Sequence, residues 1–231
     1  MTNAQLYDNY EILIDKSSTA AFQSYEFDVI ANIALRGYVE SKWKDLITNI
    51  RYEADYSRII KHNKEYHDIL RYLHTPVEVT GARIVNFTHV SLDVMFITSI
   101  QSKMRLTCEN KSTERWLYTR FVGEEESMKL EESYWDGIND VLPKYTITST
   151  GTLAANQKQI SIFTESTPVS IRVGYVRYPI MVDTTNNPNG MVDADDYVID
   201  KVLKMTVSEG ANIIEEYNKL STIQNQNIKI Q

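Results

Sequence analysis

The apolar residues of positions 24–50 recur in steps of three and four, with single steps between them. This spacing draws one broad apolar stripe along about seven turns of helix. Ser24 is a candidate cap for the helix, and Glu26 lies favourably in its first turn. The stripe consists of Phe27, Ile30, Ala31, Ala34, Leu35, Tyr38, Val39, Trp43, Leu46, Ile47 and Ile50. A chain with such a helix must supply other elements that cover this stripe.

Shorter patterns surround this long helix. A first helix is predicted from Leu6 to Ile14, followed by a polar loop, and another helical pattern runs to Leu73 and ends before Pro76. From Val77 the sequence turns to alternating, β-branched segments typical of strands, namely residues 77–79, 83–85, 90–100, 116–122, 159–163 and 169–178. Asp193 is a candidate cap for a closing helix over about 194–220.

These patterns predict an α+β protein. Residues 1–76 form a helical hairpin or bundle, and residues 77–185 form an antiparallel β part, sandwich or barrel-like, with an inserted acidic helix at about 124–141. Residues 186–220 hold a C-terminal helix that docks on one of these parts, and residues 221–231 form a flexible tail. Residues 143–158 receive no assignment.

The composition of the chain limits the classes of function that it could have. A net charge of −7 argues against a dedicated nucleic-acid-binding protein. The single cysteine, Cys108, cannot form an internal disulfide and favours synthesis in a reducing cytoplasm. The first residues lack the basic start and apolar core of a signal peptide, and no apolar run approaches the roughly 20 residues that span a membrane. We therefore expect a soluble protein.

The sequence lacks the common motifs of nucleotide-binding, catalytic and metal-binding sites. Its eight glycines are too widely spaced for a dinucleotide fingerprint, a P-loop or a nucleophile elbow. The four histidines do not have the spacing of a helical metal site, and the acidic run that begins at Glu124 is typical of a solvated face. We expect no enzyme, with no catalytic residue, cofactor or metal. An enzyme of unrecognised type is the less favoured alternative.

Several features suggest assembly instead. Tyrosine is unusually frequent, with 15 Tyr against 6 Phe, and suits surfaces that are wet in a free subunit and buried in a complex. Gly37 and Gly210 lie inside predicted helices, which is tolerable where another backbone approaches closely, either within the fold or from a neighbouring subunit. The candidate interface residues are Tyr134 and Trp135 beside the acidic run, and Ile228 and Ile230, which alternate like a short strand that adds to a neighbour's sheet edge.

The order of these elements resembles the virion ring proteins of crAss-like bacteriophages. The opening helix runs into Ile14-Asp15-Lys16-Ser17-Ser18 and then into residues 22–42 with Tyr38, as in that family. Arg58, Asp68-Ile69-Leu70-Arg71 and Leu73 resemble the helix that follows there. The strand at 169–179 that leads to Met181-Val182-Asp183 resembles a valine-rich family strand, and residues 198–214 resemble its closing helix. Leu142-Pro143-Lys144-Tyr145 matches the family's proline-flanked aromatic element only in part.

The resemblance implies a structural subunit of a head–tail connector, either a portal-proximal ring or a tail ring. It implies a homo-dodecameric ring around the genome-ejection channel, with the portal protein or adjacent ring and tail proteins as partners and DNA passing without specific binding. The protein would be made in the host bacterial cytoplasm and reside in the neck or tail of the virion, with no membrane partner. The alternative within this class is a tail-tube or head-completion protein.

Overall fold

The computed structural model describes residues 1–16, 22–49, 69–86, 94–108, 111–130, 137–149 and 158–228. The chain divides into two compact units. The helical unit comprises residues 1–52, 64–72 and 179–231, and the β unit comprises residues 53–63 and 73–178. The predicted α+β class is confirmed, with N-terminal helices, antiparallel strands in the middle and a C-terminal helix.

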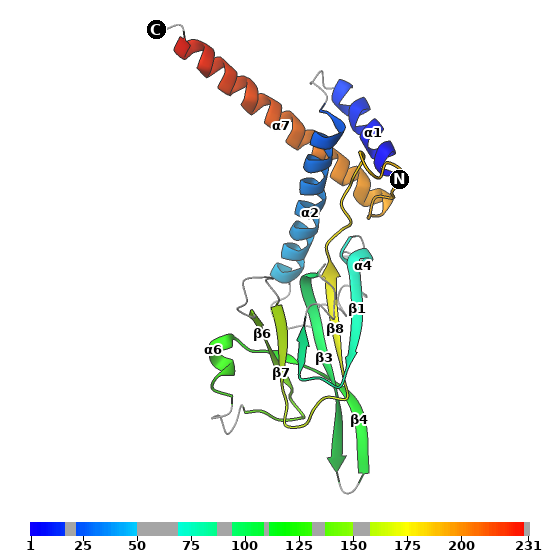
Figure 1. Cartoon of the computed structure of the whole chain (residues 1–231), viewed down its shortest axis with the longest axis vertical. Coiled ribbons are helices and arrows are strands. Elements are labelled where there is room, and N and C mark those ends of the chain that lie inside the picture. The colour runs from blue at the N-terminus through cyan, green and yellow to red at the C-terminus, as the bar shows by residue number, and fades with distance from the viewer. Residues whose placement is uncertain are drawn as a thin grey trace. The chain divides into compact units, whose positions relative to one another are not determined.

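The helical unit is built around its C-terminal helix. Helices α1 (Asn3–Lys16) and α2 (Ser24–Asn49) pack against α7 (Asp196–Ile228), as Figure 1 shows, and the short α4 (Ile69–Leu73) ends at the unit boundary. The apolar stripe predicted for α2 is buried except for Ile47, while Ile50 lies outside the described residues. Its partners in the core of the unit include Leu6, Tyr10, Ile14, Val198, Ile199, Val202 and Leu203.

Both predicted helix caps are displaced in the structure. The Glu26 carboxylate accepts a hydrogen bond from the Gln23 N–H at 2.9 Å, and Gln23 accepts the first helical bond, so α2 is capped one residue before Ser24. Helix α7 begins after Asp195, whose carbonyl accepts from Val198 and Ile199. The Asp193 carboxylate instead accepts from the backbone N–H of Ile180 at 2.8 Å.

Residues 179–195, which belong to the helical unit and precede α7, are held on α2 by side chains that hydrogen-bond to their backbone. Asn32 of α2 both donates to the Val182 carbonyl at 2.9 Å and accepts from the Val182 N–H at 2.8 Å. Asp28, one turn earlier, accepts from the Thr184 N–H and hydroxyl. The segment therefore runs antiparallel along α2 and is held in one register.

An aromatic cluster joins α1 to α2. The Tyr10 ring lies 4.9 Å from the Phe27 ring and 6.4 Å from the Tyr7 ring, between centroids. Burial raises the pKa of Tyr10 to about 12, and burial together with the nearby Glu11 carboxylate raises the pKa of Tyr7 to about 12. The folded state thus keeps two phenolic protons that the unfolded chain releases near pH 10.

This cluster predicts alkaline destabilisation. The stability that the two protons contribute is present below about pH 10 and is lost as the pH rises toward 12, on the order of 2 kcal/mol for the buried Tyr10. Denaturant unfolding measured at several pH values between 9 and 11.5 tests this. Tyr10→Phe should reduce the fall of the free energy of unfolding between pH 9 and 11.5. Tyr25→Phe, at an exposed tyrosine of α2, should leave this fall unchanged. An identical decline in wild type and Tyr10→Phe contradicts the assignment.

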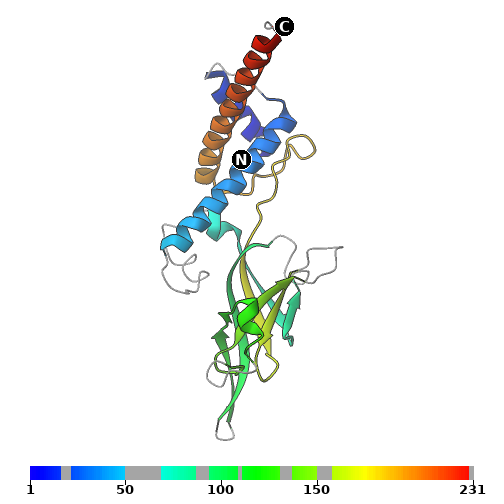
Figure 2. The ribbon, with the colours of Figure 1, turned by 90° about the vertical axis from the view of Figure 1, so that its left-hand side faces the viewer.

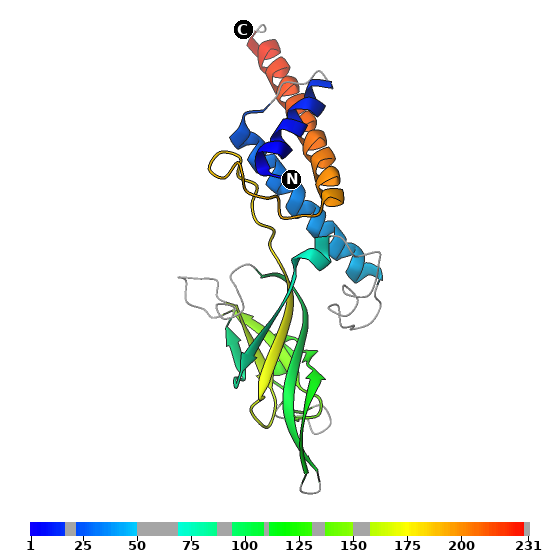
Figure 3. The ribbon, with the colours of Figure 1, turned by 90° about the vertical axis from the view of Figure 1, so that its right-hand side faces the viewer.

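The β unit is a sandwich of two four-stranded sheets. One sheet has the order β1-β8-β3-β4 and the other has the order β2-β7-β6-β5. The strands are β1 (His74–Thr80), β2 (Ile84–Asn86), β3 (Val94–Cys108), β4 (Lys111–Tyr118), β5 (Arg120–Phe121), β6 (Lys144–Ser149), β7 (Lys158–Phe163) and β8 (Ser170–Arg177). All pairs are antiparallel except β5 with β6. Figures 2 and 3 show the two sheets from opposite sides.

The core of the sandwich lies between its two sheets. Val85, Ile160 and Ile162 of one sheet meet Ile100, Ile171, Val173 and Tyr175 of the other. The chain changes sheet at four connections, namely β1 to β2, β2 to β3, β4 to β5, and β7 to β8. At the crossing from β4 to β5 the hydroxyls of Ser102 and Thr119 form a buried hydrogen bond of 2.9 Å, which satisfies both polar groups.

Beyond the sandwich, β3 and β4 continue as a two-stranded ribbon. The last register pair of β3 with β8 is Lys103 with Ser170, whereas β3 and β4 stay paired as far as Cys108 with Lys111. An exposed edge strand can form backbone hydrogen bonds with a strand of another chain. Charged side chains or a proline in the edge strand prevent this pairing. Arg105 and Glu114 lie on the ribbon, and Pro76 lies in the edge strand β1.

Three predicted boundaries are wrong. Strand β1 begins at His74, so Pro76 lies inside a strand and does not follow a helix. Of the acidic helix predicted for 124–141, the described residues, which leave out 131–136, form only α6 (Glu124–Ser127). Residues 137–142 are not helical, because the Asn139 side chain accepts from the N–H groups of Val141 and Leu142 in a turn. Residues 221–228, predicted as a flexible tail, continue α7, since extending an existing helix costs little.

Candidate functional site

The residues with catalytic or metal-binding chemistry do not come together in the described part of the chain. No group of three or more His, Cys, Asp or Glu side chains could hold a metal ion there. His74 contacts the Thr98 hydroxyl at 3.2 Å, within the sheet that contains β1 and β3. His62, His67 and His89 lie outside the described residues.

The interface residues predicted from the sequence receive little support. Tyr134 and Trp135 lie outside the described residues, as does Ile230. Ile228 is the last residue of α7, so the extended strand predicted for this position is wrong. The acidic residues Glu124, Glu125 and Glu126 form the exposed first turn of α6, where carboxylates suit the positive end of a helix.

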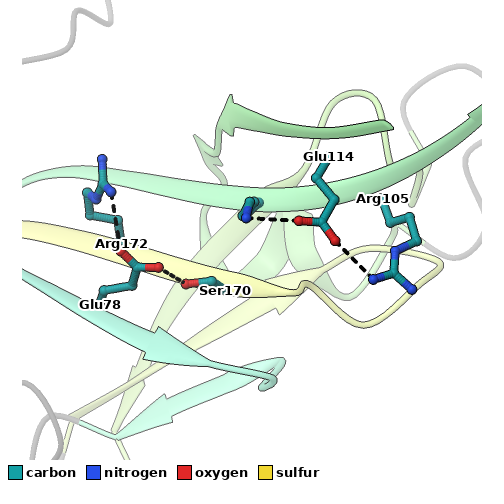
Figure 4. A network of polar contacts seen from close by, with 6 residues as sticks. Glu78, Arg105, Glu114, Ser170 and Arg172 are labelled. Carbon is teal, nitrogen blue, oxygen red and sulfur yellow. Dashed lines mark hydrogen bonds and ion pairs between the residues drawn. The ribbon is translucent and has the colours of Figure 1, made fainter. Parts of the chain in front are cut away.

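The outer face of the sheet β1-β8-β3-β4 carries a polar network (Figure 4). The Glu78 carboxylate accepts from the Ser170 hydroxyl at 2.6 Å and pairs with Arg172 at 3.2 Å. Glu114 pairs with Lys103 and with Arg105, each at 2.9 Å. The Arg172 guanidinium also lies over the Trp116 ring, 4.4 Å from its centroid.

This network is internally paired. The Ser170 hydroxyl, then Arg172, holds the pKa of Glu78 below its usual range, and Lys103 and Arg105 do the same for the pKa of Glu114. Both carboxylates are therefore charged near neutral pH and already have cationic partners. Such exposed pairs orient side chains across neighbouring strands and contribute little to stability.

The strongest candidate for a functional surface lies on α2. Tyr25, Val29 and Ile33 follow one another at four-residue spacing, so they form one row along the helix. Their side chains are 57%, 58% and 63% exposed, although the opposite side of the same helix is buried in the core. Met181 is 64% exposed and precedes Val182, whose backbone N–H donates a hydrogen bond to Asn32 of α2. This bond places Met181 on the chain segment that runs beside the row. We call Tyr25, Val29, Ile33 and Met181 the α2 surface.

A helix that is apolar around most of its circumference is typical of a buried position. Here only one side of α2 is covered by the helical unit, and the exposed residues form a cluster instead of lying singly. Clustered apolar exposure of this kind marks an interaction site. Tyr25, Val29 and Ile33 lie outside the apolar stripe predicted for this helix, and their four-residue spacing is the sequence signal of a second apolar row.

Gly37 lies one helical turn beyond Ile33. A Cβ atom built at Gly37 would meet no atom within 4 Å, so nothing in the part of the chain that the structure describes requires glycine there. At Gly210 of α7 a close approach does occur, but it comes from the side chains of Tyr10 and Phe22 in the same unit and not from another backbone as predicted. The two interior glycines thus differ in what surrounds them.

No protein-family model matches the chain, and no curated protein matches it. Within the described residues, no helix has both the length and the apolar character to cross a membrane. The α2 surface is therefore interpreted from its own geometry.

Proposed function

We propose that the protein is a structural subunit that works by assembling with copies of itself. The α2 surface carries this proposal, because it leaves an apolar row exposed on a helix whose opposite side is buried in the core. Burying such side chains against a partner is favourable by roughly 1.5–3 kcal/mol for each large residue. Burial of this surface against another subunit would therefore favour association. A protein that works in this way catalyses no reaction.

The specific assembly that we propose is a cyclic ring of a phage head–tail connector around the genome-ejection channel. The resemblance to crAss-like ring proteins supports this, because its matched segments fall on α1, α2, β8 and α7 in the order expected. The charge of −7 also suits a channel wall, since an acidic surface repels phosphate and lets DNA slide past. The expected neighbours are the portal protein or adjacent ring and tail proteins.

Electron microscopy of purified virions, with the protein identified by a tag on this chain, tests the proposal. We expect a closed ring of this chain in the neck, and native mass spectrometry of the detached neck should give a single multiple of 26.7 kDa, which is twelve for the family-like assembly. A position along the tail or at the capsid vertex outside the neck would favour a tail-tube or head-completion protein. Absence from the virion would contradict both.

A further inference from the structure

The loop of residues 183–190 holds the N-terminal end of α1. The carbonyls of Pro188 and Gly190 accept from the first two backbone N–H groups of the helix, at 3.0 and 2.8 Å. The side chain of Asn3, which is only 3% exposed, donates to the Asn187 carbonyl at 2.9 Å and to a second carbonyl of the loop at 3.2 Å. The path of the loop backbone therefore fixes where α1 begins.

The same loop contains an asparagine followed directly by a glycine, Asn189-Gly190. Asn189 is exposed, and its side chain has no hydrogen-bond partner among the residues that the structure describes. Gly190 lacks a Cβ atom, so its backbone is free to adopt conformations that other residues resist. A Cβ atom at this position would collide with the Asn187 side chain where it lies in the structure. The fold thus favours glycine directly after an exposed asparagine with a free side chain.

We propose that Asn189 is a site of spontaneous deamidation. The backbone nitrogen of Gly190 attacks Cγ of Asn189 and gives up its proton, which ends on the leaving ammonia. A bond from this nitrogen to Cγ forms while the bond from Cγ to the side-chain nitrogen breaks, which leaves a cyclic succinimide. Water then opens the ring at Cγ to give aspartate, or at the main-chain carbonyl to give isoaspartate. Either product adds one negative charge to the net charge of −7.

The other two asparagines of the loop are expected to react far more slowly. Asn187 is followed by Pro188, whose nitrogen carries no proton to give up. The Asn186 side-chain nitrogen already donates to the Asp183 carboxylate, at 3.2 Å to each oxygen. The Gly190 N–H itself donates to the Asn187 carbonyl at 3.0 Å, so this bond must open before the attack. We therefore expect modification at one position, at a rate below that of an unfolded peptide.

Isoaspartate at position 189 would disturb the contact of the loop with α1. It inserts one carbon atom into the backbone between the Pro188 and Gly190 carbonyls, which hold the N–H groups of Ala4 and Asn3. Aspartate leaves the backbone path unchanged, and a negative charge beside the N-terminal end of a helix is favourable. Only the isoaspartate product is thus expected to loosen the start of α1. The inference is independent of the assembly proposed above.

Peptide mapping of the aged full-length chain tests the modification. The protein is incubated at neutral and at mildly alkaline pH and digested with trypsin, which releases residues 178–201 as one fragment. We expect both products at Asn189, formed faster at the higher pH because the attacking nitrogen must lose its proton. The isolated fragment, incubated in parallel, is the unfolded reference. An Asn189 that stays intact in the protein after the fragment has been converted would overturn the proposal, as would equal conversion of Asn186 and Asn187.

Hydrogen exchange at the backbone N–H groups of Asn3 and Ala4 tests the consequence for α1. We expect exchange at both to be about tenfold faster in the isoaspartate fraction of the aged protein than in fresh protein. Asn189→Asp, which carries the charge without the altered backbone, should exchange like fresh wild type. Unchanged exchange in the isoaspartate fraction would contradict the effect on α1.

Two variants control for other changes during ageing. Asn189→Gln keeps the amide, but its longer side chain forms the corresponding ring much more slowly, so it should retain the exchange rates of fresh protein. Asn212→Gln, at an exposed position of α7, should age like wild type. Faster exchange at Asn3 in aged Asn189→Gln would mean that another change loosens α1 and would overturn the assignment to Asn189.

Discussion

Replacing Gly210 by alanine is expected to lower the free energy of unfolding of the helical unit by about 1–2 kcal/mol, although alanine favours a helix interior by about 1 kcal/mol. A Cβ atom there would lie 2.9 Å from the Tyr10 hydroxyl oxygen and 3.0 Å from a ring carbon of Phe22. Tyr10 is fully buried, so its ring cannot move without disturbing a close-packed core. Equilibrium denaturation followed by helical circular dichroism measures the loss.

Two variants control this experiment. Gly37→Ala makes the same chemical change in a helix where nothing lies within 4 Å, and it should stabilise the monomer by up to about 1 kcal/mol. Tyr10→Phe removes the hydroxyl, which has no hydrogen-bond partner among the described residues, and should make Gly210→Ala less costly. If alanine changed stability equally at both glycines, the packing around Gly210 would not be as described.

Replacing Asn32 by aspartate is expected to cost about 2–3 kcal/mol, because a carboxylate cannot donate. The Asn32 amide nitrogen donates to the Val182 carbonyl at 2.9 Å and to the Asp28 carbonyl at 2.7 Å. Aspartate would place a charged oxygen against both carbonyl oxygens while keeping the size of the side chain. We expect residues 180–184 to detach from α2, which limited proteolysis and denaturation would both detect.

The matched control for this substitution is Asn212→Asp. Asn212 is exposed on α7, so the same change in charge should alter stability by less than about 0.5 kcal/mol. Asn32→Asp should also weaken self-association, because Met181 of the α2 surface is positioned through Val182. Similar stability of the two variants would mean that the Asn32–Val182 pair does not hold the segment.

Local sequence patterns identified most of the elements but misplaced several ends. The α2 stripe was recognised because its apolar residues recur with the period of a helix. Strand β8 was recognised by its alternating apolar residues, although both of its faces are largely buried and the single buried face expected from the alternation is wrong. The acidic helix was overextended because the Asn139 turn is formed by a side chain, which a hydrophobic pattern does not register. Strand β6 was left unassigned although its residues alternate between polar and apolar, and its apolar residues Tyr145 and Ile147 pack against the sandwich core. Its polar residues Lys144 and Thr146 are buried as well, which the sequence does not indicate.

The candidate site was harder to predict than the fold. The sequence drew attention to Tyr134, Trp135, Ile228 and Ile230, since aromatic residues near charges and alternating residues in a tail are common at interfaces. The α2 surface was missed because an apolar residue in a helix is ordinarily assigned to the core. Only burial values separate Val29, which is exposed, from Ile30, which is not.

The sequence by itself determined the α+β class, the long helix α2 with its apolar stripe, and the charge, because periodicity and composition act locally along the chain. Only the tertiary structure decided which side of α2 is covered, where the segment of Val182 is bound and which interior glycine is crowded. These properties depend on contacts between residues that are far apart in sequence, such as Asn32 with Val182 and Tyr10 with Gly210. No periodicity within a single segment records such contacts.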